Sequence, residues 1–119
     1  MERTLRNKSS YLNGQAAEHQ VARHYAEQGY HLTAQRWRGA GGEIDLIFMN
    51  KSDMVFVEVK KSVSFAGACR HFSSAQAARI REAALSYLAS QDMSQDTNMR
   101  FDLVLLDQNA DMQIIANAF

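Results

Sequence analysis

Residues 42–47 read Gly-Glu-Ile-Asp-Leu-Ile, and after a short polar gap residues 55–60 read Val-Phe-Val-Glu-Val-Lys. Both runs are apolar and rich in β-branched residues, which predicts two strands over 43–49 and 54–60. The connection over residues 50–53 is polar and has a length that is common in β-hairpins. Packing does not require acidic groups inside such strands, so the acids indicate a functional site.

The length of the turn sets the register of this hairpin. Pairing across it places Asp45 opposite Glu58, and Glu43 opposite Lys60. Because strand side chains alternate with a period of two, all four should share one face. We expect the opposite face to be filled by the apolar side chains, which are Ile44, Leu46, Phe48, Val55, Val57 and Val59.

Directly opposed carboxylates repel each other. A divalent cation between Asp45 and Glu58 would remove that cost, and Mg²⁺ takes such oxygen ligands together with waters and phosphate oxygens. Lys60 would flank the metal, where it could orient an attacking water or stabilise charge on a phosphate. Each residue alone is explained more simply by a solvated face or an edge that resists aggregation. The combination favours a metal site.

This pattern resembles the YraN-like family of endonuclease-like proteins, a branch of the PD-(D/E)XK nuclease superfamily that is similar in fold to archaeal Holliday junction resolvases. The likeness covers most of residues 13–106. Besides the two strands, it includes Gly14, Ala17, Glu18, Ala22, Gly29, Tyr30, Phe65, Gly67 and the segments 79–88 and 100–102.

The resemblance implies a restriction-endonuclease-like α/β sandwich, with a central mixed sheet flanked by helices. It also implies hydrolysis of phosphodiester bonds in DNA, including branched or otherwise structured DNA, with Mg²⁺ or Mn²⁺ as cofactor. Asp45 and Glu58 match the superfamily's metal-binding acids, and Lys60 matches its motif lysine. Glu18 matches an acid on the first helix of related nucleases that can complete the metal shell. For Glu43 we expect an auxiliary role, either binding a second metal or pairing with Lys60.

Two positions depart from the family pattern. Ser62 stands where an arginine is usual, and Gln76 stands where a lysine is frequent. Ser73 and Gln76 instead fit a capping box at the start of a helix. These losses support an alternative in which the chain is a weak or inactive nucleic-acid-binding or assembly module on a nuclease scaffold. A third hypothesis treats the opposed acids as a structural cation site that stabilises the hairpin.

Charge is distributed unevenly, although the chain has thirteen basic and thirteen acidic residues. Residues 1–81 hold twelve Lys or Arg and seven Asp or Glu, whereas residues 82–119 hold one and six. The basic part contains the predicted site, which favours nucleic acid as the partner, although a solvated surface would explain any single arginine. The side chains expected to contact phosphates are Arg36, Arg38, Lys61, Arg70 and Arg79.

The rest of the chain predicts a single domain over residues 13–119, preceded by a flexible arm over residues 1–12. We expect helices over 14–28 and 74–90, a strand near 30–34, a loop over 62–72, a buried strand over 101–106 and a short edge strand over 112–115.

No run approaches the roughly 18 apolar residues of a transmembrane helix, and the N-terminus lacks the apolar stretch of a signal peptide. The single Cys69 can form no internal disulfide. These features predict a cytoplasmic protein with no membrane partner. Related resolvases need two active sites to cut two strands, so a homodimer is one arrangement that the resemblance implies.

Overall fold

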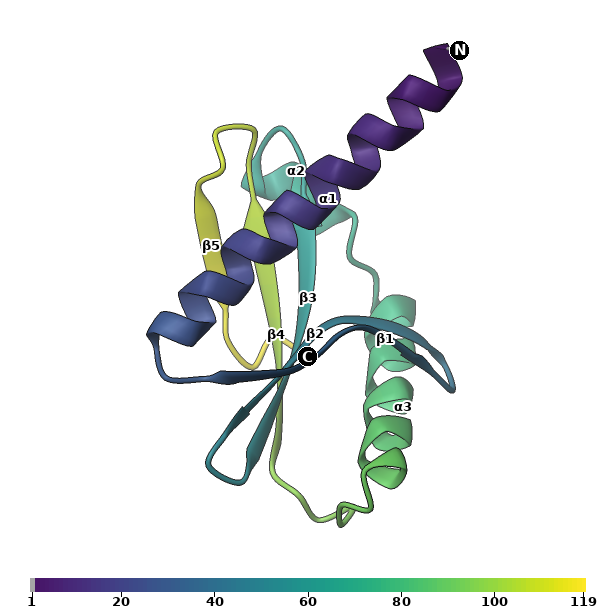
Figure 1. The fold of residues 1–119 in the computed structure, drawn as a ribbon, viewed down its shortest axis with the longest axis vertical. Helices are drawn as coiled ribbons and strands as arrows, with labels where there is room; N and C mark the ends of the chain where they lie inside the picture. Colours follow the sequence, from purple (N-terminus) through teal and green to yellow (C-terminus); the bar gives the residue numbers. More distant parts are fainter. Residues whose placement is uncertain (1) are drawn as a thin grey trace.

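A computed structural model describes the backbone of residues 2–119 and the side chains of residues 14–119. Its elements are α1 (Glu2–Glu27), β1 (His31–Gly39), β2 (Gly42–Asn50), β3 (Asp53–Lys61), α2 (Phe65–Arg70), α3 (Ser74–Ser90), β4 (Met99–Leu106) and β5 (Met112–Ile115). The strands form one five-stranded sheet in the order β1-β2-β3-β4-β5 (Figure 1). Neighbouring strands are antiparallel except β3 and β4, which are parallel and are connected through α2 and α3. The fold is therefore α/β with a mixed sheet.

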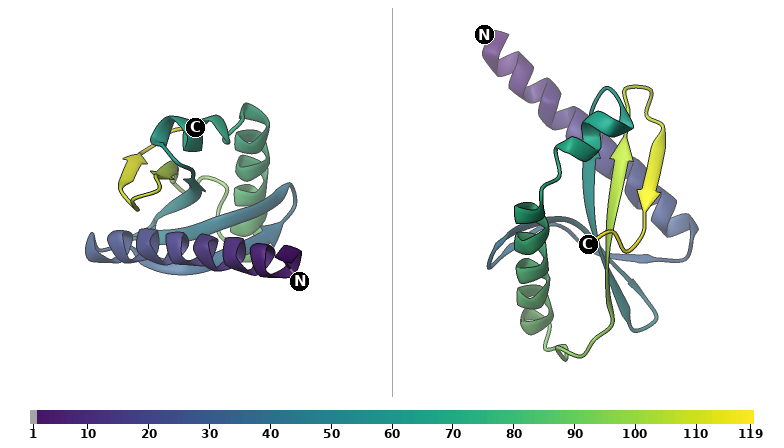
Figure 2. Two further views of the ribbon diagram at one scale, coloured as in Figure 1. Left: turned by 90° about the horizontal axis from the view of Figure 1, so that it is seen from above. Right: turned by 180° about the vertical axis from the view of Figure 1, so that it is seen from behind.

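Helices cover both faces of the sheet (Figure 2). On one face α1 packs through Ala17, Val21 and Tyr25. On the other face α3 packs through a row that includes Ile80 and Leu88. The short helix α2 covers β4 on the same side as α3, through contacts of Ala68. Burial on both faces explains why β2, β3 and β4 are almost continuously apolar.

The first helix ends as predicted. Gly29 has a φ of 92°, and the N–H groups of Gly29 and Tyr30 donate to the carbonyls of Ala26 and Tyr25. This is the Schellman arrangement, which favours glycine. The helix begins at Glu2 rather than near residue 14. The side chains of residues 1–13 lie outside the described residues, and the flexible arm predicted over residues 1–12 stays a prediction.

The second long helix has the predicted bounds, Ser74–Ser90. The capping box is confirmed, because the Ser73 hydroxyl accepts from the Gln76 N–H at 3.1 Å and the Gln76 side chain accepts from the Ser73 N–H at 3.3 Å. The loop predicted over residues 62–72 is wrong in its middle, where α2 forms. Ser64 is the N-cap of this helix, since its hydroxyl accepts from the Gly67 N–H. The helix is too short to show helical periodicity.

The predicted strand over 101–106 is confirmed within β4, and the edge strand over 112–115 coincides with β5. The first strand is longer than predicted and runs through polar residues as far as Gly39. In the described part of the chain, no helix is both long and apolar enough to span a membrane.

Candidate functional site

The β2–β3 pairing confirms the predicted register from the turn as far as the Leu46–Val57 pair, and the ladder ends there. Further along, β2 continues to pair with β1. The β1–β2 hairpin bends away from β3 and reaches α3 (Figure 1), where the Ala40 N–H donates to the Ser86 hydroxyl. β2 and β3 therefore separate just before Asp45 on β2 and Glu58 on β3.

Asp45 is the first residue of β2 beyond the ladder. Its Oδ2 atom accepts a hydrogen bond from the backbone N–H of Val59 at 2.8 Å. In the continued register Val59 would face Ile44, so the carboxylate takes the place of a backbone acceptor. This bond fixes the Asp45 carboxylate between the two strands.

The alternation of side chains is interrupted at Asp45. Ile44 and Ile47 both pack against α3, whereas Leu46 and Phe48 pack against α1. The prediction that Ile44 shares a face with Leu46 and Phe48 is therefore wrong. The interruption coincides with the end of the β2–β3 ladder and with a left-handed backbone at Arg36 on β1, directly across from Asp45.

Glu58 lies on the face covered by α2 and α3, beside Leu103 of β4, and is only 7% exposed. Burial, followed by hydrogen bonding to Asp45 and the negative charge of Asp45, raises the pKa of Glu58 to about 9. The positive charge of Lys60 acts in the opposite direction. The structure thus brings together the two predicted acids and the lysine.

The Asp45–Glu58 contact offers oxygen ligands of the kind that a hard divalent cation takes. Two carboxylate groups meet in a largely buried position, and only a proton or a cation between them removes their repulsion. Both come from the central strands of the sheet, one of them fixed by a backbone N–H, so the oxygen donors are preorganised.

Glu18 lies on α1 and faces inward as predicted, with 8% of its surface exposed. Its carboxylate accepts from Arg36 Nη2 at 2.6 Å and from Arg36 Nε at 3.1 Å. Burial and the charge of Asp45 raise the pKa of Glu18, and the Arg36 hydrogen bond opposes them. Among the described side chains, no three His, Cys, Asp or Glu residues form a ready cluster of metal ligands. Glu18 is near Asp45 but bound by arginine.

Glu43 is exposed and pairs with Arg38, whose Nη2 lies 3.0 Å from Glu43 Oε2. Arg38 is also its strand partner on β1. The predicted opposition of Glu43 and Lys60 is absent from the described β2–β3 ladder, because the strands have already separated.

The model of a known family, described as Uncharacterised protein family UPF0102, matches residues 17–106. That span includes α1 from Ala17 onward, the whole sheet except β5, and every predicted site residue. The chain belongs to this family.

Several UPF0102 proteins resemble the chain over almost its full length. A UPF0102 protein of Ruegeria pomeroyi is 45% identical over 96% of this chain and 93% of its own length. One from Cereibacter sphaeroides is 46% identical over 92% of this chain and 94% of its own length. One from Dinoroseobacter shibae is 40% identical over 97% of this chain and 86% of its own length.

The remaining basic residues predicted at phosphates lie on three elements, β3, α2 and α3. Lys61, Arg70 and Arg79 are exposed at the end of β3, on α2 and on α3. The β1–β2 turn approaches the same helix, since a Cβ on Gly41 would lie 2.8 Å from the Arg79 carbonyl oxygen. Arg36 is the exception, because it contacts the acid on α1.

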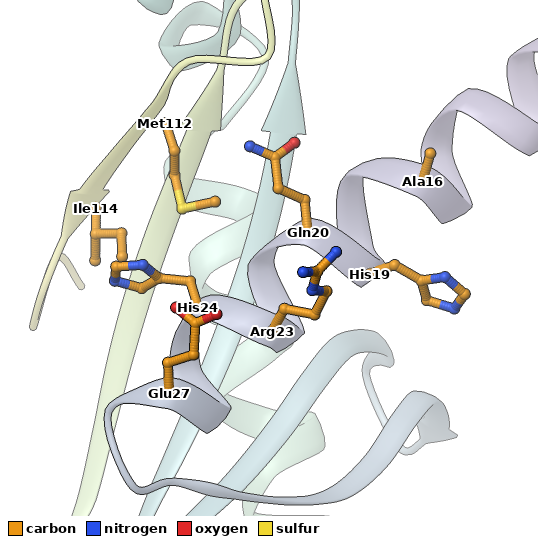
Figure 3. A pocket seen from close by; sticks show the side chains of 8 residues that line it. All are labelled: Ala16, His19, Gln20, Arg23, His24, Glu27, Met112 and Ile114. Carbon is orange, nitrogen blue, oxygen red and sulfur yellow. The ribbon is translucent and has the colours of Figure 1, made fainter.

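A groove of about 900 Å³ lies away from these acids, between α1 and the edge strand β5 (Figure 3). Two histidines and an arginine of the helix line it, opposite Met112 and Ile114. Its residues were not predicted as a site, and the Asp45–Glu58 pair does not line it.

A buried acid on the other face of the sheet was missing from the predicted site residues. Asp102 is fully buried and accepts from Tyr25 Oη at 2.7 Å, from Arg100 Nε and Nη2 at 2.9 Å each, and from the Asn117 N–H at 2.9 Å. The sequence signal was an acid inside an apolar strand. Because its hydrogen-bond donors come from α1, β4 and the C-terminal segment, Asp102 joins parts of the fold.

Proposed function

We propose that this UPF0102 chain is a divalent-metal-dependent endonuclease that hydrolyses phosphodiester bonds in DNA. The observation that supports this most strongly is the contact between the Asp45 and Glu58 carboxyl groups, at the point where β2 and β3 separate. Two acids that meet in a buried position, with neither a cation nor an arginine between them, are unfavourable for folding. A purely structural role therefore does not explain the pair.

The chain's own residues have distinct parts in this proposal. Asp45 and Glu58 hold the metal, and the Val59 N–H keeps Asp45 oriented toward it. Lys60, whose charge already acts on Glu58, orients the attacking water or donates to the phosphate. Mg²⁺ or Mn²⁺, when bound, lowers the pKa of a coordinated water and polarises the phosphate.

The surroundings of the site suit a polyanion. Arg38 is 81% exposed at its side chain, and Arg70 and Arg79 are exposed on α2 and α3, the helices that cover the face that Glu58 occupies. Contacts from such residues to phosphates would position the duplex without reading its sequence. The similarity to Holliday junction resolvases makes branched DNA the first substrate to test.

The architecture supports the same proposal. A mixed sheet whose central pair, β3 and β4, is parallel, with α1 on one face and α2 and α3 on the other, fits a restriction-endonuclease-like sandwich. A homodimer would supply two such sites for two strands, and the exposed thiol of Cys69 suits a reducing compartment such as the cytoplasm.

Cleavage of duplex, single-stranded and four-way-junction DNA with Mg²⁺ or Mn²⁺ tests the proposal. We expect Asp45→Asn and Glu58→Gln to abolish metal-dependent cleavage while circular dichroism shows an unchanged fold. The matched control is Asp53→Asn, because Asp53 is an exposed acid at the turn of the same hairpin. Cleavage that survives in both site variants would exclude these acids from the reaction.

A second candidate is a nucleic-acid-binding module without catalysis. It is favoured by the engagement of Gln76 in the capping box, which leaves no basic group at that position, and by the ion pair that holds Glu18. This alternative predicts salt-dependent DNA binding that Glu58→Gln does not change, together with no cleavage by the wild-type protein.

A further inference from the structure

The ion pair between Glu18 and Arg36 joins α1 to β1 beside the proposed metal site. Its two Arg36 nitrogens lie 2.6 and 3.1 Å from Glu18 Oε2, which is a forked, charge-assisted contact. The Glu18 side chain is 11% exposed, whereas the Arg36 side chain is 34% exposed. The acid is therefore enclosed, and its arginine partner is reachable from solvent.

The backbone of Arg36 is unusual for a strand residue. Its φ is 48°, in the left-handed region that residues other than glycine and asparagine adopt at a cost. Arg36 lies between the pairs Gln35–Leu46 and Trp37–Ile44, directly across from Asp45. Left-handed residues in strands concentrate at functional sites.

This backbone has a clear effect on neighbouring side chains. Ala34 and Trp37 both pack against the α3 cluster, so the alternation of β1 is reset between them. Because of this reset, Trp37 can cover α3 while Arg36 reaches Glu18 on the opposite face. The fold thus places an arginine on this acid through a distorted strand.

The charges around the ion pair mean that both Arg36 and a divalent cation would attract the Glu18 carboxylate. Asp45 and Glu43 both raise the pKa of Glu18, which places their negative charges nearby, and Arg36 offsets them. A divalent cation at Asp45 and Glu58 would attract the same carboxylate. Arginine and metal therefore compete for Glu18.

We propose that Arg36 is a displaceable counter-ion, which occupies Glu18 in the DNA-free protein and leaves it for a nucleic-acid phosphate. Release of Arg36 frees Glu18 to join Asp45 and Glu58 at the metal. This inference rests on the proposed function, and it makes Arg36 a positioning residue that couples phosphate binding to metal binding. A phosphate matches the forked guanidinium as a carboxylate does, so the exchange conserves the hydrogen bonds of the arginine.

The first test is calorimetric titration of Mn²⁺ into the full chain without DNA. We expect Arg36→Asn, which suits a left-handed backbone, to bind Mn²⁺ about tenfold more tightly than the wild type, within the usual range of coupling between sites. In the Glu18→Gln background the same substitution should have no effect, because the carboxylate for which Arg36 and the metal compete is gone. Arg81→Asn is the matched control, since it removes an exposed arginine of α3 that has no part in the proposed site, and it should change the affinity less than about twofold.

Three results would overturn the inference. They are equal or weaker Mn²⁺ binding by Arg36→Asn, an equal gain in the Glu18→Gln background, and an equal gain in Arg81→Asn. Unfolding temperatures of all variants identify any that fail to fold, and Arg36→Lys then provides a second variant that keeps the charge but loses the fork. We expect an intermediate gain from it, and no gain would count against the inference.

The second test uses Ca²⁺ with and without a short DNA duplex. We expect DNA to strengthen Ca²⁺ binding by the wild type at least about fivefold more than by Arg36→Asn, since coupling between sites is reciprocal. Equal strengthening would contradict the exchange. Failure of this test with intact, Asp45-dependent cleavage would reject the role of Arg36 alone. Cleavage that is independent of Asp45 would reject the proposed function, whatever the Ca²⁺ titrations show.

Discussion

The two faces of the central sheet each bury a carboxylate, but they treat it differently. On the face that α1 covers, Asp102 receives hydrogen bonds from Tyr25, Arg100 and the Asn117 backbone. On the opposite face, Glu58 lies against a second acid, Asp45, and its pKa rises to about 9. Compensated burial stabilises a fold, whereas uncompensated burial is retained where a ligand supplies the missing charge.

We expect the largest change in stability from removing the charge of Asp102, the buried acid that has hydrogen-bond donors. Asp102→Asn leaves Arg100 without its ionic partner, and we expect it to lower the free energy of unfolding by about 3 kcal/mol. Urea denaturation measures this. Asp96→Asn is the control, because Asp96 is exposed and its substitution should change stability by less than about 0.5 kcal/mol. Similar results for both variants would mean that the Asp102 network does not stabilise the fold.

Removing the charge of Glu58, the buried acid that lies against Asp45, should change stability in the opposite direction. The folded protein raises the pKa of Glu58 from 4.5 to about 9, so at neutral pH it holds a proton that the unfolded chain has released. Stability should therefore fall as the pH rises between these two values. Glu58→Gln removes this dependence and should stabilise the metal-free protein by about 2 kcal/mol at mildly alkaline pH. Urea denaturation across this pH range, with a chelator present, provides the measurement.

The contrast predicts that Asp102→Asn and Glu58→Gln change stability in opposite directions. Loss of stability in Glu58→Gln at every pH would show that the Glu58 carboxyl, like that of Asp102, is a structural group.

We expect the smallest change in stability from removing a single hydrogen bond to Asp102. Tyr25→Phe removes the donor that lies 2.7 Å from Asp102 Oδ2 and should cost about 1 kcal/mol in urea denaturation. Tyr30→Phe is the matched control. Its hydroxyl receives a longer bond of 3.3 Å from Arg100, and we expect a loss below about 0.5 kcal/mol. Equal losses of stability in the two variants would mean that the Tyr25 hydrogen bond stabilises buried Asp102 no more than the longer Arg100–Tyr30 bond stabilises its partners.

Local rules predicted much of the fold. The turn between β2 and β3 and the apolar pattern set the register, and Ser73 with Gln76 marked the start of α3. They did not predict where the ladder ends. That point depends on the β1–β2 turn reaching α3, a contact between residues about 46 apart in sequence, Ala40 and Ser86.

The candidate site was predicted in the same partial way. The contact of Asp45 with Glu58 follows from the hairpin, and the inward orientation of Glu18 follows from the helix. The partner of Glu18 does not, because a left-handed Arg36 is invisible in a strand pattern and arises only from packing on both faces. Asp102 was overlooked as a buried acid because two of its donors, Tyr25 and the Asn117 N–H, come from segments outside its strand.

The most direct test of the central claim is Mn²⁺ titration of isotopically labelled protein, followed by nuclear magnetic resonance. Bound Mn²⁺ broadens the signals of nearby amides, so it separates the proposed site from the far end of the same hairpin in one experiment. We predict that the Val59 and Lys60 amide signals disappear first, while those of Lys51 and Ser52 at the β2–β3 turn remain. Broadening that spares Val59 and Lys60, or that is unchanged in Asp45→Asn, would contradict a metal site at the separated strands.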